Sequence, residues 1–263
     1  MKAVICRNMN KADDGCSVIA GIIAELNGFG IDAEFAEQVH GDCDVIITVG
    51  GDGTILHHGK AAARLGKPLL GINMGRLGFM TSLELGELAY LEQLKAGSYH
   101  VCLRMMLDVK VGNDVHLALN DAVFYRDNNS KLPEFTVMCD GHVVSEVRAD
   151  GLIVSTPTGS TAYALSAGGP IIEPWLDCIE LSYLCAHSLF GRPLIFSAEH
   201  PVTVRHNDAR KRSVFISVDG EHGLPLGAGE DVIISRSAQR LSLIDLKGGS
   251  FHNAVKNKLM RSL

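Results

Sequence analysis

Long apolar runs and basic blocks are both missing from this 263-residue chain. No stretch approaches the roughly 18 apolar residues of a membrane-spanning helix, and the apolar run in the opening "MKAVICRNMN" is too short for a signal peptide. The formal net charge is −6, with no concentrated Lys/Arg segment. We therefore expect a cytoplasmic protein without a membrane or nucleic-acid partner.

Paired cysteine and histidine motifs are also missing. The seven cysteines form an odd count without a C-x-x-C spacing, which favours reduced thiols in the cytosol. Of the eleven histidines only His57 and His58 are adjacent, and no H-x-x-x-H or H-E-x-x-H spacing occurs. The sequence therefore predicts no metal site fixed by the protein alone.

The first hundred residues alternate between strand-like and helix-like patterns. Apolar runs such as "DVIITV" at 44–49 are typical of parallel strands covered on both faces. This alternation predicts a doubly wound, Rossmann-like α/β domain over 1–100. The expected strands cover 2–7, 32–35, 44–49 and 67–74, and the expected helices cover 16–26, 55–66 and 83–97.

From residue 101 the pattern changes to short β-rich runs separated by Gly, Asp and Asn turns. Such spacing predicts a β-sandwich-like domain over 101–245. One small-residue segment, 159–169, is expected to be helical within it. The tail, 246–263, is expected to form a helix that packs back on the first domain.

The segment "DVIITVGGDGT", 44–54, places three glycines around Asp52 at the end of a strand. Glycines let backbone N–H groups approach a phosphate, and the following helix N-terminus favours an anion. A carboxylate repels phosphate, so Asp52 needs another task, such as holding Mg²⁺ or accepting a hydroxyl proton. The alternative is a plain Asp-Gly turn. The segment fits neither the Walker pattern nor G-x-G-x-x-G.

A second segment, "RADGLIVSTPTGSTAYALSAGGP" at 148–170, reads as a strand, a turn and a helix start. Five hydroxyl side chains surround its Pro-Thr-Gly turn, and small residues follow, which permits close approach of a ligand. The alternative role of Ser160 or Thr161 is a helix N-cap, which accounts for one hydroxyl but not for five. The hydroxyl residues are Ser155, Thr156, Thr158, Ser160 and Thr161.

Taken together, these segments resemble the NAD kinase family, which phosphorylates the 2′-hydroxyl of the adenosine ribose of NAD. "GGDGT" alone is weakly specific, because diacylglycerol-type lipid kinases and phosphofructokinases carry similar turns. The 150–170 segment is highly specific. Six such segments occur in the family's order, and together they extend over most of the chain. They are "GGDGT" (50–54), "NMGRLGF" (73–79), "LND" (119–121), "DGLIVSTPTGSTAYALSAGGP" (150–170), "HSLFGRP" (187–193) and "SVDG" (217–220).

In the first domain the resemblance implies that Asp52 is the catalytic aspartate and Gly53 its phosphate-loop partner. His57 matches a position near substrate, with a surface helix histidine as the alternative. Leu56 and Phe79 match apolar walls near the adenine, with a core role as the alternative.

In the second domain the resemblance implies that Asn120 and Asp121 hold ribose hydroxyls, because an adjacent amide and carboxylate can donate and accept together. The alternative is a hairpin turn. Arg148 and Asp150 match dinucleotide contacts, and Lys131 is a looser match. The helix start that lines the nucleotide is matched by Thr161, Ala162, Tyr163 and Ser166.

Two other matched positions, His187 and Arg192, are interpreted as structural. The chain departs from the family pattern at Ala186-His187-Ser188 and at Asp219-Gly220-Glu221. A carboxylate at Glu221 accepts but does not donate hydrogen bonds; this weakens a ligand contact there, although His222 beside it offers a donor.

The resemblance implies an NAD kinase that uses ATP or polyphosphate as donor and Mg²⁺ or another divalent ion, which Asp52 helps to hold. A homodimer or homotetramer built through the β domain is expected. Two alternatives stay open: a lipid kinase, although its G-T-x-N-D segment is not found in the sequence, and a non-enzymatic dinucleotide sensor.

Overall fold

The computed structural model describes residues 1–7, 15–75, 78–127, 131–188, 191–207 and 213–259. They form two compact units, one of residues 1–104 with 240–263 and one of residues 105–239. The divisions fall inside strands β6 (His100–Val111) and β17 (Asp231–Asp245). The sequence predicts boundaries at 100/101 and 245/246, a few residues away from the divisions at 104/105 and 239/240. They differ because turn residues in a sequence indicate where strands end, whereas the units divide in the middle of strands.

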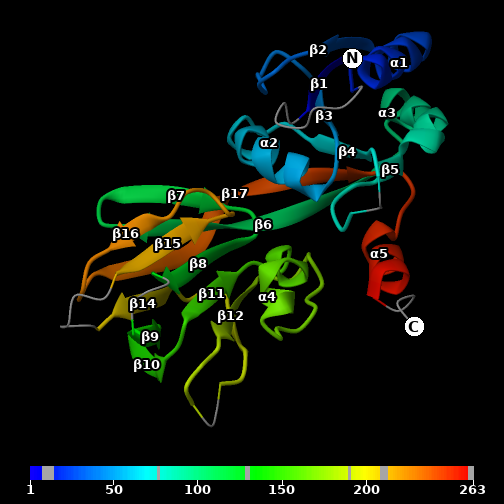
Figure 1. Cartoon of the computed structure of the whole chain (residues 1–263). Helices are drawn as coiled ribbons and strands as arrows, with labels where there is room; N and C mark the ends of the chain where they lie inside the picture. Colours follow the sequence, from blue (N-terminus) through cyan, green and yellow to red (C-terminus); the bar gives the residue numbers. More distant parts are fainter. Residues whose placement is uncertain (8–14, 76–77, 128–130, 189–190, 208–212, 260–263) are drawn as a thin grey trace. The chain divides into compact units, whose positions relative to one another are not determined.

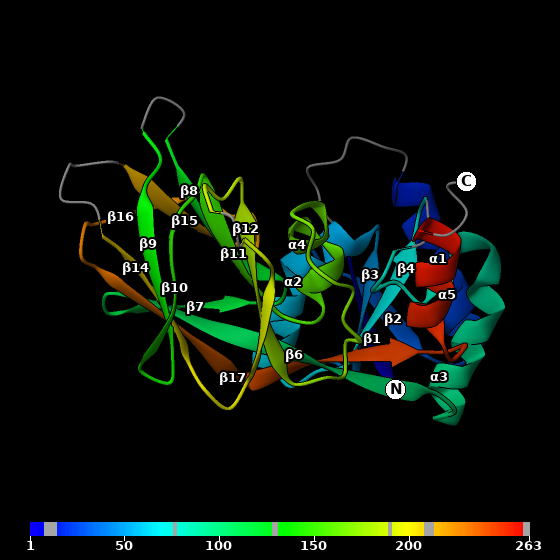
Figure 2. The same cartoon turned by 90° about the horizontal axis from the view of Figure 1, so that it is seen from below.

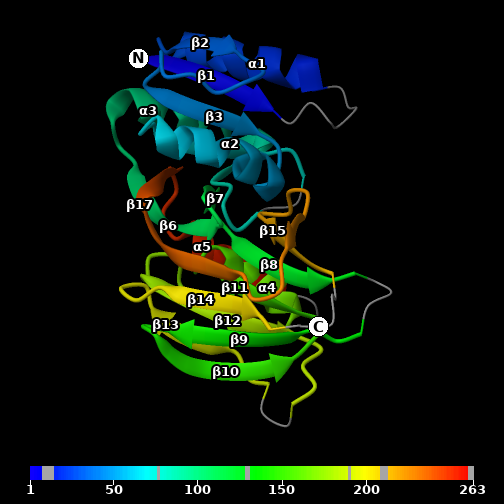
Figure 3. The same ribbon diagram turned by 90° about the vertical axis from the view of Figure 1, so that its left-hand side faces the viewer.

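The first unit is built on a parallel sheet with the strand order β2-β1-β3-β4. Strand β5 and the end of β17 also pair with β4 in parallel. Figure 3 shows β2, β1 and β3 side by side. β3 and β4 are buried along their whole lengths, as their continuous apolar runs predict. The bounds are β1 Lys2–Arg7, β2 Asp32–Phe35, β3 Val45–Val49, β4 Leu69–Asn73 and β5 Leu83–Glu84.

Helices cover this sheet, and α1 and α3 lie close together in Figure 1. Ile22 and Leu26 of α1 pack with Ile5 and Ile47 of the strands in one buried cluster. The helix expected over 83–97 is only partly helical. The cause is a capping box between Glu84 and Glu87, which starts a new 3₁₀ segment after the short β5. The helical segments are α1 Gly15–Gly28, α2 Asp52–Arg64, η1 Leu85–Leu91, α3 Glu92–Ala96 and α5 Ser250–Leu259.

The second unit holds two antiparallel layers, which Figure 2 separates as β9, β10 and β14 against β8, β11 and β12. One follows the order β10-β9-β14-β17, and the other follows β13-β12-β11-β8-β15-β16. Phe124, Phe135 and Leu152 belong to the buried cluster that both layers share. The remaining bounds are β7 Asp114–Ala118, β8 Asp121–Arg126, β9 Glu134–Cys139, β10 His142–Arg148, β11 Gly151–Ser155, β12 Cys178–Leu184, β13 Leu194–Ser197, β14 Val202–His206, β15 Val214–Val218 and β16 Leu224–Leu226. The expected α/β and β-sandwich-like architecture is confirmed.

Two local expectations in the second unit differ from the structure. Strand β12 is missed by the sequence pattern because Glu180 and Ser182 interrupt its apolar run, yet both are buried. The Ser182 hydroxyl donates to Glu180 at 2.7 Å, and burial raises the pKa of Glu180. The helix expected over 159–169 is a 3₁₀ turn, η2 (Gly159–Thr161), followed by α4 (Tyr163–Ser166), because Ala162 has non-helical dihedrals of −102° and −124°.

Across the described ranges, no helix is long and apolar enough to cross a membrane.

Candidate active site

The glycine turn forms the N-terminus of α2, three residues earlier than the sequence pattern places the helix. Gly50 has a φ of +153°, and a Cβ there would meet the Thr54 hydroxyl at 2.2 Å, so a larger residue does not fit. Gly51 is the N-cap residue, and no side chain caps the helix. The first N–H groups of a helix lack intrahelical partners. The turn therefore presents an uncapped helix N-terminus, which favours an anion.

Asp52 opens α2 but does not cap it. Its Oδ2 accepts a hydrogen bond from the Phe79 N–H at 2.7 Å, and its Oδ1 accepts one from the Met80 N–H at 3.1 Å. A Cβ at Gly78 would lie 1.8 Å from Oδ1 of Asp52, so the carboxylate occupies space that only a glycine leaves. The carboxylate is thus fixed from the neighbouring loop, and each oxygen retains capacity for a further hydrogen bond or a metal.

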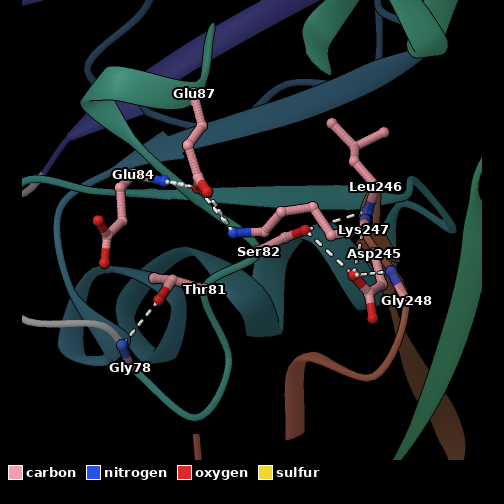
Figure 4. A network of polar contacts seen from close by, with 9 residues as sticks. All are labelled: Gly78, Thr81, Ser82, Glu84, Glu87, Asp245, Leu246, Lys247 and Gly248. Carbon is pink, nitrogen blue, oxygen red and sulfur yellow. Dashed lines mark hydrogen bonds and ion pairs between the residues drawn. The ribbon is translucent and has the colours of Figure 1, made fainter. Parts of the chain in front are cut away.

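A polar network holds the loop that supplies these two amides (Figure 4). The Gly78 N–H donates to the Thr81 hydroxyl at 2.9 Å. Ser82 donates to Asp245 at 3.4 Å and accepts from the Leu246 N–H at 3.1 Å. Because Asp52 is positioned by this loop, the network positions Asp52 indirectly.

A second part of the network ties the following turn to the C-terminal segment. Lys247 donates to Glu87 at 2.7 Å, and the Glu84 N–H donates to the same carboxylate at 2.9 Å (Figure 4). Two segments far apart in the sequence therefore meet at the Glu87 carboxylate.

The other expected residues of the first unit lie near the turn. His57 is exposed on α2, one turn after Asp52, and its ring centroid is 4.7 Å from that of His58. His58 is buried beside the Arg7 carbonyl, and burial lowers its pKa. Leu56 is half-buried, and Phe79 is half-buried with its ring 6.4 Å from that of Phe251. The structure thus brings Asp52 and Phe79 into direct contact and leaves His57 facing solvent.

In the second unit, Asp219 holds Asn120 and Asp121. Its carboxylate accepts hydrogen bonds from the N–H groups of Leu119, Asn120 and Asp121 at 2.9, 2.8 and 3.2 Å, and its own N–H donates to the Asp121 carbonyl at 2.9 Å. Asp219 has a φ of +52°, followed by Gly220 at +75°. This grip fixes the backbone from which the Asn120 and Asp121 side chains project.

Asp121 has an unusual protonation equilibrium because of the same arrangement. Its side chain is 5% exposed. Burial, and then the negative charge of Asp219, raises its pKa to about 7. At neutral pH a large fraction of Asp121 therefore carries a proton and can donate as well as accept a hydrogen bond.

Most hydroxyls of the hydroxyl-rich turn make hydrogen bonds to backbone groups. Thr156 donates to the Leu119 carbonyl at 2.6 Å and accepts from the Gly159 N–H at 3.0 Å. Ser155 and Ser160 donate to backbone carbonyls at 2.8 and 2.7 Å. Thr161 donates to the Thr158 carbonyl at 3.2 Å, which leaves only the buried Thr158 hydroxyl without a partner within the described part of the turn.

This turn and the Asn120 strand end are brought together. The Thr156 N–H donates to the Asn120 carbonyl at 2.8 Å, and a Cβ at Gly159 would lie 2.2 Å from that carbonyl oxygen. Thr161 and Ala162 follow the turn and are half-buried, while Tyr163 and Ser166 are exposed on α4.

The remaining expected residues lie outside this contact group. Arg148 makes an ion pair with Glu134 at 3.4 Å, and Asp150 makes one with Arg126 at 2.6 Å. Four further positions, Lys131, His187, Arg192 and Glu221, are exposed.

No cluster of three or more His, Cys, Asp or Glu side chains suited to a metal occurs within the described residues. Mg²⁺ is commonly held by one or two carboxylates together with substrate phosphates. Asp52, next to an uncapped helix N-terminus, fits that mode.

Two residues of the candidate site escape sequence reasoning. In the sequence, Asp219 stands out only as part of the "SVDG" segment and beside Glu221, and Gly78 only as part of the "NMGRLGF" segment. The Asp-Gly pair at 219–220 is a turn signal, but its partners lie about a hundred residues away in sequence. Gly78 carries no signal of its own, because its importance comes from the position of Asp52.

The fold and these two turns define a candidate phosphate- and nucleotide-binding protein of the mixed α/β and β-sandwich type. Residues 6–99 match the ATP-NAD kinase N-terminal domain, and residues 119–246 match the ATP-NAD kinase C-terminal domain. The chain is 40% identical over 252 residues to the NAD kinase of Alcanivorax borkumensis, covering 93% of this chain and 84% of that protein. It is also 40% identical over 225 residues to that of Symbiobacterium thermophilum, covering 83% and 79%. The chain belongs to the NAD kinase family.

Solved structures agree on the fold. A yeast NADH kinase complexed with NADH superposes with a TM-score of 0.83 at 22% identity, covering 99% of this chain and 87% of that one. An Archaeoglobus fulgidus NAD kinase in complex with ATP superposes with a TM-score of 0.78 at 27% identity, covering 96% of each chain.

Proposed function

We propose that this protein is an NAD kinase that transfers a phosphoryl group from ATP, or from polyphosphate, to the 2′-hydroxyl of the adenosine ribose of NAD. The observation that carries the proposal is the position of Asp52. Its carboxylate binds the Phe79 and Met80 amides and leaves its own helix N-terminus uncapped. A carboxylate beside an open anion site suits phosphoryl transfer, which needs a phosphate cradle and a group that orients the hydroxyl.

In this mechanism the glycine turn and the N-terminus of α2 bind the donor phosphates, including through Gly53. Asp52 orients the ribose 2′-hydroxyl and accepts its proton. In a loose, metaphosphate-like transition state the proton leaves late, so a weak base suffices. Positioning and charge neutralisation then supply much of the rate enhancement. A divalent ion, when bound, neutralises phosphate charge, and Asp52 is the residue that would help to hold it.

Dinucleotide recognition is assigned to the second unit. Asn120 and Asp121 bind ribose hydroxyls through their side chains. The hydrogen bonds from their backbone N–H groups to Asp219 support this role, because they fix both residues before a ligand binds. Lys131, Arg148, Asp150 and Glu221 remain proposed ligand contacts on the strength of the family pattern, together with His57, Phe79, Thr161, Ala162, Tyr163 and Ser166.

We further infer a cytoplasmic location and a homodimer or homotetramer. The seven cysteines are all free, as expected for reduced thiols in the cytosol. The assembly is proposed from the family pattern. Analytical ultracentrifugation of the purified protein tests it by measuring the mass of the assembly in solution.

An activity screen tests the proposed function. NAD and NADH are each crossed with ATP and with polyphosphate, in the presence of Mg²⁺. The product is detected with an NADP-specific dehydrogenase, which reads the 2′-phosphate. We expect NADP formation with at least one donor. A purified, folded protein that binds NAD but forms no product with any donor supports the dinucleotide sensor instead.

A further inference from the structure

Arg104, on strand β6, carries a buried charge that the proposed mechanism has not used. Its side chain is 4% exposed, and among the described residues its Nε has no hydrogen-bond partner. Burying an arginine without a hydrogen-bonded partner is unfavourable, and proteins normally pair such a charge. A buried guanidinium whose Nε lacks a hydrogen-bond partner therefore points to an anion that arrives from outside the chain.

The charges around Arg104 place it near the glycine turn. Burial lowers the pKa of its guanidinium, and the nearby Cys102, Asp52 and Asp245 raise it. Neither carboxylate hydrogen-bonds to it. Asp52 accepts from the Phe79 and Met80 amides, and Oδ1 of Asp245 accepts from the Lys247 and Gly248 amides, both at 3.1 Å. Arg104 thus lies within electrostatic reach of Asp52 while keeping hydrogen-bonding capacity for a ligand.

A second buried donor adjoins the same turn. Asn73 ends strand β4 and is 3% exposed. Its Oδ1 accepts a hydrogen bond from the Gly75 N–H at 3.3 Å. It also lies 4.0 Å from the position that a Cβ on Gly51 would take. Because Oδ1 is used in this way, Nδ2 is fixed as a donor, and it has no partner among the described residues. Asn73 is therefore an unsatisfied buried donor beside the glycine turn, and Arg104 is a second one within electrostatic reach of Asp52.

We propose that Arg104 and Asn73 bind the polyphosphate chain of the phosphoryl donor at the glycine turn, with the Arg104 guanidinium as its principal cationic partner. The proposal deepens the proposed kinase function, since the anion it names is the donor of that reaction. An arginine is suited to this task because its planar donors match phosphate oxygens in a bidentate geometry.

The test compares Arg104→Met and Arg104→Lys with wild type and with Arg64→Met, which removes an exposed arginine from α2. The probe is inorganic tripolyphosphate with excess Mg²⁺, and the readout is the thermal unfolding midpoint. Tripolyphosphate is expected to raise the Tm of wild type and Arg64→Met, and to raise that of Arg104→Met much less. Without ligand, Arg104→Met is expected to be as stable as wild type or more stable, because the cost of burying a charge without hydrogen bonds is gone.

Kinetics supply an independent readout. In Arg104→Met the KM for ATP is expected to rise by about 10–100-fold, the range of a lost charge-assisted hydrogen bond, while the KM for NAD changes little. Arg104→Lys keeps the charge but loses the bidentate geometry, so an intermediate KM for ATP is expected with a near-normal Tm. Asn73→Asp, which replaces the free donor by an acceptor, is expected to weaken the tripolyphosphate shift as well.

Two results overturn the proposal. One is a wild-type Tm that tripolyphosphate does not move. The other is a structural pattern, in which Arg104→Met lowers the ligand-free Tm while the tripolyphosphate shift of Arg104→Lys equals that of wild type. Failure of the kinase function is seen separately, because the tripolyphosphate shift requires no turnover of NAD.

Discussion

The glycine turn at 50–54 and the hydroxyl-rich turn at 155–161 both follow a buried strand, yet they treat their polar groups in opposite ways. The first leaves a helix N-terminus uncapped and directs its carboxylate to amides of another segment. The second uses four of its five hydroxyls to satisfy its own backbone and that of its neighbours. Open polar groups mark a place where a ligand completes the structure, whereas satisfied ones mark a scaffold.

The largest expected effect concerns the scaffold around Asn120, where Asp219 stabilises the backbone but repels Asp121. The pKa of Asp121 in the folded protein, about 7, is above its unfolded value. The folded state therefore retains the proton, and its stability falls as pH rises from about 4 through 7. We expect Asp121→Asn to gain about 3 kcal/mol relative to wild type between pH 4.5 and pH 8. Urea unfolding at both pH values measures this, with the exposed Asp114→Asn as control. A stability difference that does not change with pH contradicts the proposed charge repulsion.

The next effect concerns the open turn. In Gly78→Ala the new methyl group would meet Oδ1 of Asp52, so the carboxylate must move. A displacement of about 1 Å can cost on the order of 10²-fold in rate. We therefore expect kcat to fall by about that factor. Gly75→Ala is the matched control, because a Cβ there has no neighbour within 4 Å. Equal kcat values for the two variants would show that Asp52 does not need its observed position.

The smallest effect tests the satisfied turn directly. Thr156→Val removes a hydroxyl that both donates to Leu119 and accepts from Gly159, so it leaves two buried backbone groups unpaired. We expect a loss of about 2 kcal/mol in the free energy of unfolding. Thr158→Val removes a hydroxyl without a partner and is expected to leave stability unchanged or slightly higher. Equal losses of stability in both variants would contradict the assignment of Thr156 as a structural hydroxyl and Thr158 as an unpartnered one.

The sequence predicts elements whose signals are local. The glycine turn, the parallel strands before it and the final helix follow from apolar runs and turn residues, and the structure contains all of them. The resemblance to the NAD kinase family is confirmed by both domain matches.

Features set by contacts between distant residues are not predictable in this way. Asp52 and Phe79 are 27 residues apart, and Asp219 and Leu119 are 100 residues apart. Strand β12 is missed because a buried glutamate looks like a surface residue until Ser182 supplies its partner. Similarly, the number of hydroxyls at 155–161 does not reveal that most of them face the backbone.

The proposed catalytic role of Asp52 is tested most directly by kcat and stability measured on one purified Asp52→Asn variant. The amide retains an oxygen for one of the two loop N–H groups and leaves the other without an acceptor, so a loss of about 1 kcal/mol in stability is expected. Loss of the proton acceptor is expected to lower kcat by about 10²-fold or more, while NAD binding is nearly preserved and the exposed Asp32→Asn control stays at the wild-type rate. A well-folded Asp52→Asn protein whose kcat stays within about threefold of wild type, far less than the rate loss expected for a missing general base, would contradict the catalytic role of Asp52.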